Sequence, residues 1–219
     1  MPNARQHAIA HSQTRTRERR HQVAAEAAKI LALGGTRDFY QAKQTAAERL
    51  GIFDHASLPR NSEIELALRE YQRLFVPDQD DALRIRREAA IEALKFFSAF
   101  DPRLAGPVLE GTADSRSAVV IHVHTDEPEA IDRWLDQNRI DYDVRNRHLR
   151  LDRVRELDVS CYVFEADGLR IEVLALPYSV LRQAPLSPVD EKPMRRANLM
   201  QAKALVTQAE IEDHFRSQD

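Results

Sequence analysis

Two histidines and one glutamate in this sequence are candidates for metal binding or for acid–base catalysis. His122 and His124 stand two residues apart in an apolar run, so a β-strand would place both imidazoles on one face. A buried imidazole needs a partner, and histidine is the usual proton carrier near neutral pH. Three interpretations stay open for the pair: structural residues, metal ligands or a catalytic acid and base. Glu172 lies in a later apolar run, and its carboxylate would serve a metal site or a catalytic site.

Gly111-Thr112 precedes this strand, and the order of these residues resembles the signature of the nucleotidyltransferase (polymerase-beta-like) family. In that family, backbone N–H groups of a Gly-Ser or Gly-Gly turn hold nucleotide phosphates. Two acids on the next strand bind divalent metal, and a third acid stands on a neighbouring antiparallel strand. Here His122 and His124 occupy the positions of the two acids, and Glu172 matches the third. The resemblance covers residues 104–177.

The resemblance implies a divergent nucleotidyltransferase-like protein that binds a nucleotide or a phosphorylated small molecule. An altered metal site of His122, His124 and Glu172 would favour a transition metal over Mg²⁺, because Mg²⁺ prefers oxygen ligands. Arg195 and Arg196, in the C-terminal tail, would reach a phosphate; the alternative is a charged entrance to a helix. If the protein is an enzyme, the expected activity is nucleotidyl transfer. A non-catalytic regulatory or interaction module on the same fold is the alternative.

Hydrophobic spacing divides the chain into a helical half and a mixed half. Apolar residues recur with a helical period until Asp101-Pro102, and the period then shifts towards that of strands. Helices are expected at residues 16–33, 38–50, 61–76, 80–100, 126–138 and 199–215. Strands are expected at residues 117–125, 141–145, 148–152, 159–165 and 169–176.

The expected fold class is α+β. Residues 1–101 would form a helical domain with a basic N-terminal arm. Residues 102–219 would form a nucleotidyltransferase-like domain with a mixed, mostly antiparallel sheet, a proline-rich strap and a C-terminal helix. The turn Ala166-Asp167-Gly168 predicts a hairpin between two of the strands, and Asp126 is expected to cap the helix that follows the histidines.

Composition and charge indicate which kinds of partner the whole chain does not favour. The chain has 219 residues and a formal net charge of −3, so its overall charge favours neither nucleic acid nor membrane. Its apolar runs are only of strand length, which predicts no membrane-spanning helix. The single cysteine, Cys161, fits a reducing compartment, and a cytoplasmic location is expected. Homo-oligomerisation is left open.

Residues 1–22 offer a different partner. Five arginines stand against one glutamate in this segment, and clustered arginines can neutralise the phosphates of nucleic acid. No aromatic residue lies among them to stack on bases, which favours a solvated arm that becomes helical near Thr16.

Overall fold

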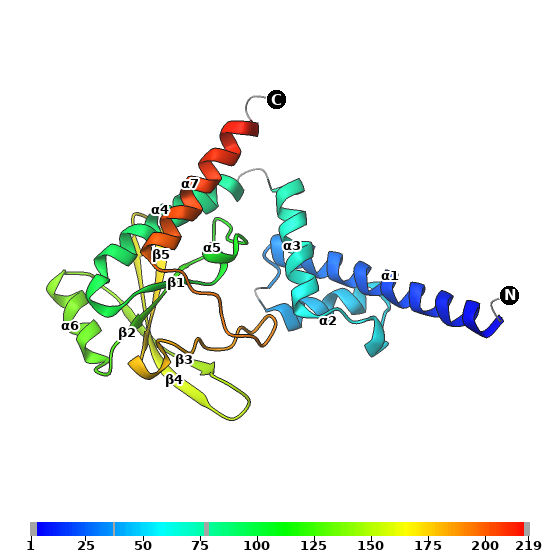
Figure 1. The fold of residues 1–219 in the computed structure, drawn as a ribbon, viewed down its shortest axis with the longest axis horizontal. Coiled ribbons are helices and arrows are strands. Elements are labelled where there is room, and N and C mark those ends of the chain that lie inside the picture. The colour runs from blue at the N-terminus through cyan, green and yellow to red at the C-terminus, as the bar shows by residue number, and fades with distance from the viewer. Residues whose placement is uncertain (1–3, 37, 77–78, 217–219) are drawn as a thin grey trace. The chain divides into compact units, whose positions relative to one another are not determined.

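The computed structural model describes residues 4–36, 38–76 and 79–216. The chain is an α+β protein that divides into two compact units, Met1–Pro77 and Asp78–Asp219 (Figure 1). In its described residues, the first unit contains the helices α1 (Ala4–Ala32), α2 (Phe39–Leu50) and α3 (Asn61–Phe75), with the 3-10 turn η1 (His55–Ser57). Its core is formed by the apolar faces of these helices, with Val23, Ala27 and Ile64 fully buried.

Local signals set the ends of these helices. The side chain of Asp38 accepts hydrogen bonds from the backbone N–H groups of Tyr40 and Gln41 at the start of α2. Gly51 ends α2 in the left-handed conformation, with φ +65°, which glycine adopts without strain. Both ends lie where the sequence predicts them.

The second unit is built on a five-stranded mixed sheet with the order β1-β2-β5-β4-β3. The strands are β1 (Arg103–Ala105), β2 (Val119–His124), β3 (Asp143–Arg150), β4 (Glu156–Ala166) and β5 (Leu169–Leu176). Only β2 and β5 pair in parallel, and the other three pairings are antiparallel. The hairpin β4–β5 is confirmed. The sheet is therefore mixed and mostly antiparallel, as the sequence predicts.

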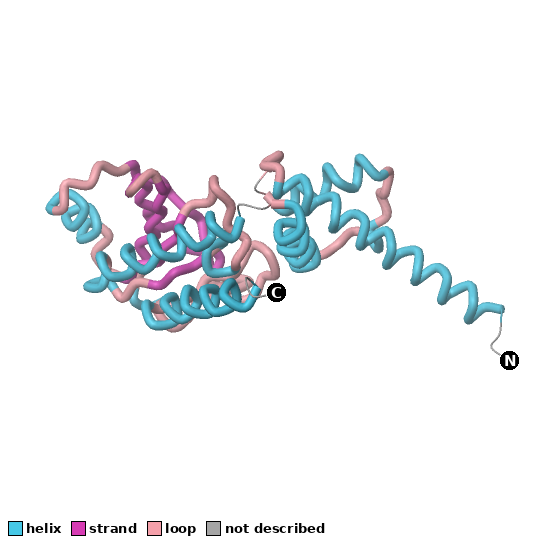
Figure 2. Tube along the Cα trace, turned by 90° about the horizontal axis from the view of Figure 1, so that it is seen from above, coloured by secondary structure: helices cyan, strands magenta, loops and turns pink. Residues whose placement is uncertain are grey.

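Helices cover one face of the sheet and an irregular segment contributes to the other (Figure 2). The helices of this unit are α4 (Gln79–Phe96), α5 (Pro107–Glu110), α6 (Glu129–Gln137) and α7 (Leu199–Arg216), with the turns η2 (Ser98–Phe100) and η3 (Tyr178–Val180). Leu94 and Phe97 join Ile121 and Val173 in the core on the helical face. On the opposite face, Val180 of η3 packs with Cys161, whose thiol is fully buried as expected for a packed cysteine.

The compact units divide at residues 77/78, whereas the sequence places the domain boundary at 101/102. The difference concerns α4, which packs against β2 and α7 within the second unit. Its apolar stripe is visible in the sequence, but a stripe does not specify which surface it covers.

Three local predictions need correction. The first helix begins at Ala4 rather than near Thr16, because good helix formers with no glycine or proline continue it towards the N-terminus. The two short strands expected around Asn146-Arg147 are one strand, β3. Asp126 does not cap α6; its carboxylate accepts the backbone N–H of Tyr178 at 3.0 Å and so ties the end of β2 to the segment after β5.

Candidate functional site: a basic cluster at the end of β2

His122 and His124 lie on the sheet face opposite the helices, as alternation along β2 requires. The register pairs His122 with Arg103 of β1 on one side and with Leu174 of β5 on the other. His124, two residues further, pairs with Leu176. Both imidazoles are buried, with 1% and 0% of their surface exposed. The prediction that the two rings share a face agrees with this register.

His124 has a defined tautomer because both of its ring nitrogens have partners. Nδ1 lies 2.8 Å from the carbonyl oxygen of Asp101, and Nε2 lies 3.3 Å from Nη1 of Arg196. A guanidinium only donates, so Nε2 accepts and Nδ1 carries the proton donated to Asp101. Burial lowers the pKa of His124, which keeps this ring neutral.

His122 has a buried nitrogen without a partner. Its Nδ1 makes no hydrogen bond with any described residue and is closed to solvent. Burial lowers the pKa of His122 to about 3, and the nearby charge of Arg196 acts in the same direction. A buried polar atom without a partner costs free energy, so native proteins contain few of them unless the atom serves a ligand, water or reaction.

Two half-buried arginines complete the cluster. Arg103 of β1 is the direct cross-strand partner of His122 on β2, and its guanidinium donates to the carbonyl of Pro102 at 2.8 Å. Arg196 donates to the carbonyls of Val180 and Leu181, which holds the segment after β5 against the end of β2. Among the described residues, neither guanidinium forms an ion pair with a carboxylate. Burial lowers the pKa of Arg196, and the positive charge of Arg103 adds to this effect.

Glu172 shares the sheet face of the histidines but lies nearer the start of β2. It is level with Val120, two residues before His122. Its Oε2 pairs with Arg147 of β3 at 3.1 Å, and its Oε1 pairs with Arg170 at 2.9 Å. The carboxylate is thus held between two guanidiniums rather than beside the imidazoles. β5 also runs parallel to β2, whereas the resemblance implies an antiparallel neighbour for the third acid.

The Gly-Thr turn forms the end of α5 and precedes β2, whereas the histidines lie towards the other end of that strand. Gly111 adopts the left-handed conformation, with φ +77°. The backbone N–H groups of Gly111 and Thr112 both donate to the carbonyl of Pro107. These two N–H groups therefore close the short helix, as in many helix C-termini, and do not point freely at a phosphate.

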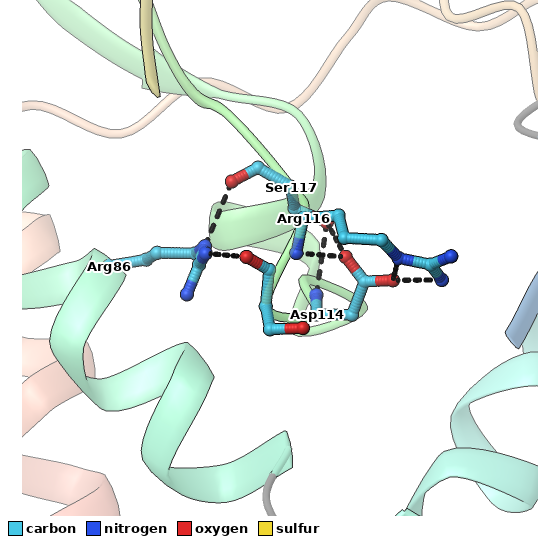
Figure 3. A network of polar contacts seen from close by, with 5 residues as sticks. Arg86, Asp114, Arg116 and Ser117 are labelled. Carbon is cyan, nitrogen blue, oxygen red and sulfur yellow. Dashed lines mark hydrogen bonds and ion pairs between the residues drawn. The ribbon is translucent and has the colours of Figure 1, made fainter. Parts of the chain in front are cut away.

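Arg86 of α4 organises the loop between this turn and β2 (Figure 3). Its guanidinium donates to the carbonyls of Ser115 and Ser117 in the loop, and to that of Ala82 in its own helix. Within the loop, Asp114 accepts from the hydroxyl of Ser117 and pairs with Arg116 at 2.8 Å. The sequence gives no direct sign of this role, because the partners of Arg86 are backbone groups about thirty residues away.

Arg195 and Arg196 have separate surroundings although they are adjacent. Arg195 is exposed and forms an ion pair with Glu110 at 3.0 Å. Arg196 is the member of the pair that joins the histidines. The sequence does not predict a role for Arg103. Its position directly after Asp101-Pro102 is the local signal, but its pairing with His122 depends on the register of a three-residue strand.

The predicted metal ligands do not form a ligand set as they stand. Both oxygens of Glu172 lie in ion pairs and both nitrogens of His124 are hydrogen-bonded, which leaves His122 with an unpartnered nitrogen. In the described part of the chain, no group of three or more His, Cys, Asp or Glu side chains is arranged to hold a metal ion. The two nearby guanidiniums add positive charge, which disfavours a cation.

Comparison with known proteins leaves the family undetermined. No protein-family model matches this chain, and no curated protein is significantly similar to it. None of the helices that the structure describes is long and apolar enough to cross a lipid bilayer.

Proposed function

We propose that the second unit is a divergent nucleotidyltransferase-like domain that binds a nucleotide or a phosphorylated small molecule at the cluster of Arg103, His122, His124 and Arg196. One observation carries this proposal: two half-buried guanidiniums lie beside buried imidazoles, and neither has a carboxylate partner among the described residues. Arginine recognises phosphate through several parallel N–H bonds and keeps its charge when partly buried. A phosphate group fits the charge of this cluster.

Binding can be tested with the full-length protein. Ligands that bind only the folded state raise the melting temperature, by an amount that grows with the logarithm of the ligand concentration divided by its Kd. A panel of nucleoside mono-, di- and triphosphates, pyrophosphate and sugar phosphates should contain at least one compound that stabilises the protein. The matching nucleosides and sugars without phosphate serve as controls and should produce no shift. The absence of a shift with every phosphorylated compound would contradict the proposal.

Catalysis is a separate question from binding. Incubation with labelled ATP and a range of acceptors measures nucleotidyl transfer directly. A product whose formation stops in His122→Gln, with the fold intact, supports an enzyme. Ligand binding without any product supports the regulatory module on the same fold.

A nucleic-acid role for the first unit is the second candidate, and the distribution of charge favours it. Residues 1–77 contain twelve Lys and Arg against eight Asp and Glu, whereas the rest of the chain is acidic. A groove between α1 and α3 in this unit has Arg17, Arg20 and His21 on its α1 side, and Glu63 and Glu70 on its α3 side. Side chains of residues 1–12 lie outside the described part of the chain.

Salt dependence tests this second candidate. If arginines of α1 contact phosphates, binding of the full chain to an oligonucleotide weakens with salt, and each contact removed lowers the slope by about 1. The variant Arg15→Gln/Arg17→Gln should lower both the affinity and the slope. The matched control is Arg69→Gln/Arg73→Gln on α3, and equal loss in both variants would point to net charge alone.

A further inference from the structure

The basic cluster has hydrogen-bond donors to spare. With partners in the described part of the chain, Arg196 makes three hydrogen bonds and Arg103 one, whereas a guanidinium has five N–H groups. His122 has an unpartnered ring nitrogen within the same set of side chains. Both arginines are partly exposed, so solvent reaches the cluster from one side. The surplus on the two arginines consists of donors, and His122 adds a third in the tautomer that carries the proton on Nδ1, so one acceptor group would satisfy all three side chains.

The charges nearby point to an anion. After burial, the positive charge of Arg103 is the second cause that lowers the pKa of Arg196, and two like charges this near are unfavourable unless an anion lies between or beside them. The negative group that acts on the cluster is the exposed carboxylate of Asp101, whose charge is felt by His124. Glu172 is neutralised by its own two arginines and contributes no free charge.

The side chains at this position differ from those that bind a metal ion. In a metal-dependent phosphate site, carboxylates hold a divalent cation, and the cation neutralises the phosphate. Here the lone pair of His124 Nε2 is already occupied by an arginine N–H group. The positive charge that a metal would supply is present as guanidinium. Resting on the proposed function, we infer that the phosphate group of the ligand binds directly to Arg103 and Arg196, with His122 as a neutral third donor, and that this binding requires no divalent metal.

The test measures binding of pyrophosphate and of ATP to the full-length protein by titration calorimetry, once with EDTA and once with millimolar Mg²⁺. The affinity in EDTA should be within about threefold of that in Mg²⁺, beyond the change that chelation of the ligand itself produces. Arg103→Gln should weaken binding in EDTA about tenfold or more, the usual result of losing a charge-assisted contact. Arg103 suits this test because its only hydrogen bond within the described chain is to the carbonyl of Pro102.

Two further variants serve as controls. Arg103→Lys keeps the charge without the planar fork and should retain part of the affinity. Arg195→Gln removes an exposed arginine next to Arg196 and should leave the affinity unchanged. Far-UV circular dichroism and fluorescence of Trp134, the single tryptophan, confirm the fold of each variant.

The outcomes distinguish failure of the metal-free site from failure of the proposed function. Binding that appears only with Mg²⁺ would overturn the inference and keep the proposed function. Binding in EDTA that is equal in wild type and Arg103→Gln would place the phosphate elsewhere and overturn the inference too. No binding of any phosphorylated compound under either condition would overturn both.

Discussion

Arg196 donates to Nε2 of His124 across 3.3 Å, and this contact joins the C-terminal tail to the end of β2. The same guanidinium donates to the carbonyls of Val180 and Leu181, so one side chain fastens two segments. The contact also settles the protonation of His124, which must be neutral to accept it. Both the position of the tail and the tautomer of His124 therefore depend on Arg196.

We expect Arg196→Gln to lower the free energy of unfolding of the second unit by about 2 kcal/mol, because hydrogen bonds from a charged donor to two carbonyls are lost. Urea unfolding followed by Trp134 fluorescence measures this value, since Trp134 packs against Phe96 and Phe100 in this unit. Arg195→Gln is the matched control and should change stability by less than about 1 kcal/mol. Equal effects of the two substitutions would show that Arg196 does not fasten the tail.

Stability should fall as the pH is lowered from 7.5 to 5.5. Burial lowers the pKa of His122 to about 3 and also lowers that of His124, whereas an unfolded histidine has a pKa of about 6.5. Below this pH the unfolded chain takes up protons that the folded chain does not, so the stability present above it is lost. Each such histidine contributes at most about 1.4 kcal/mol per pH unit. His148 acts in the opposite direction, because Asp158 raises its pKa.

Urea unfolding at several pH values should therefore use a His148→Gln background. Adding His122→Gln should flatten the dependence on pH, whatever its effect on stability at neutral pH. A dependence that is as steep with His122→Gln as without it would show that His122 is not held neutral in the folded chain.

Arg86→Met should destabilise the second unit by about 3 to 5 kcal/mol. The substitution leaves the carbonyls of Ala82, Ser115 and Ser117 without their donor in a partly buried position. Arg84→Met on the same helix removes only exposed ion pairs with Asp81 and Glu88 and should cost much less. Chemical denaturation of both variants compares the two directly, and similar costs would refute the role given to Arg86.

A fragment of residues 78–219 should unfold cooperatively, whereas residues 102–219 should not. The shorter fragment lacks Ala90, Leu94 and Phe97, which are buried in the core on the helical face of the sheet. Losing several such side chains exceeds the stability of a typical domain. Sharp thermal unfolding of the shorter fragment would support the boundary at residue 101 instead.

Short-range signals in the sequence account for much of the fold. The helix expected at residues 38–50, which ends at Gly51, and the β4–β5 hairpin depend on a few adjacent residues, and both are as expected. The pattern also places His122 and His124 on one face, because alternation along a strand is a local property. Arg170 shares the face of Glu172 and pairs with it for the same reason.

The composition of the site depends on long-range pairing, which a single sequence does not contain. Arg103 joins His122 only through the register of β1 with β2, and Arg147 reaches Glu172 across β4. A single sequence also does not show which backbone groups already have hydrogen-bond partners. The N–H groups of the Gly-Thr turn donate to a carbonyl within α5. A sequence motif therefore identified the face of the site but not the charges that surround it.

The most direct measurement is the ¹⁵N NMR spectrum of the histidine side chains during titration with pyrophosphate in EDTA. Before ligand is added, both His122 and His124 should give signals of neutral rings near pH 7. Pyrophosphate should shift the Nδ1 signal of His122 in wild type and in Arg195→Gln at the same concentrations, and in Arg103→Gln only at concentrations about tenfold higher or more. Unchanged signals from His122 at concentrations that saturate binding would contradict the proposed site.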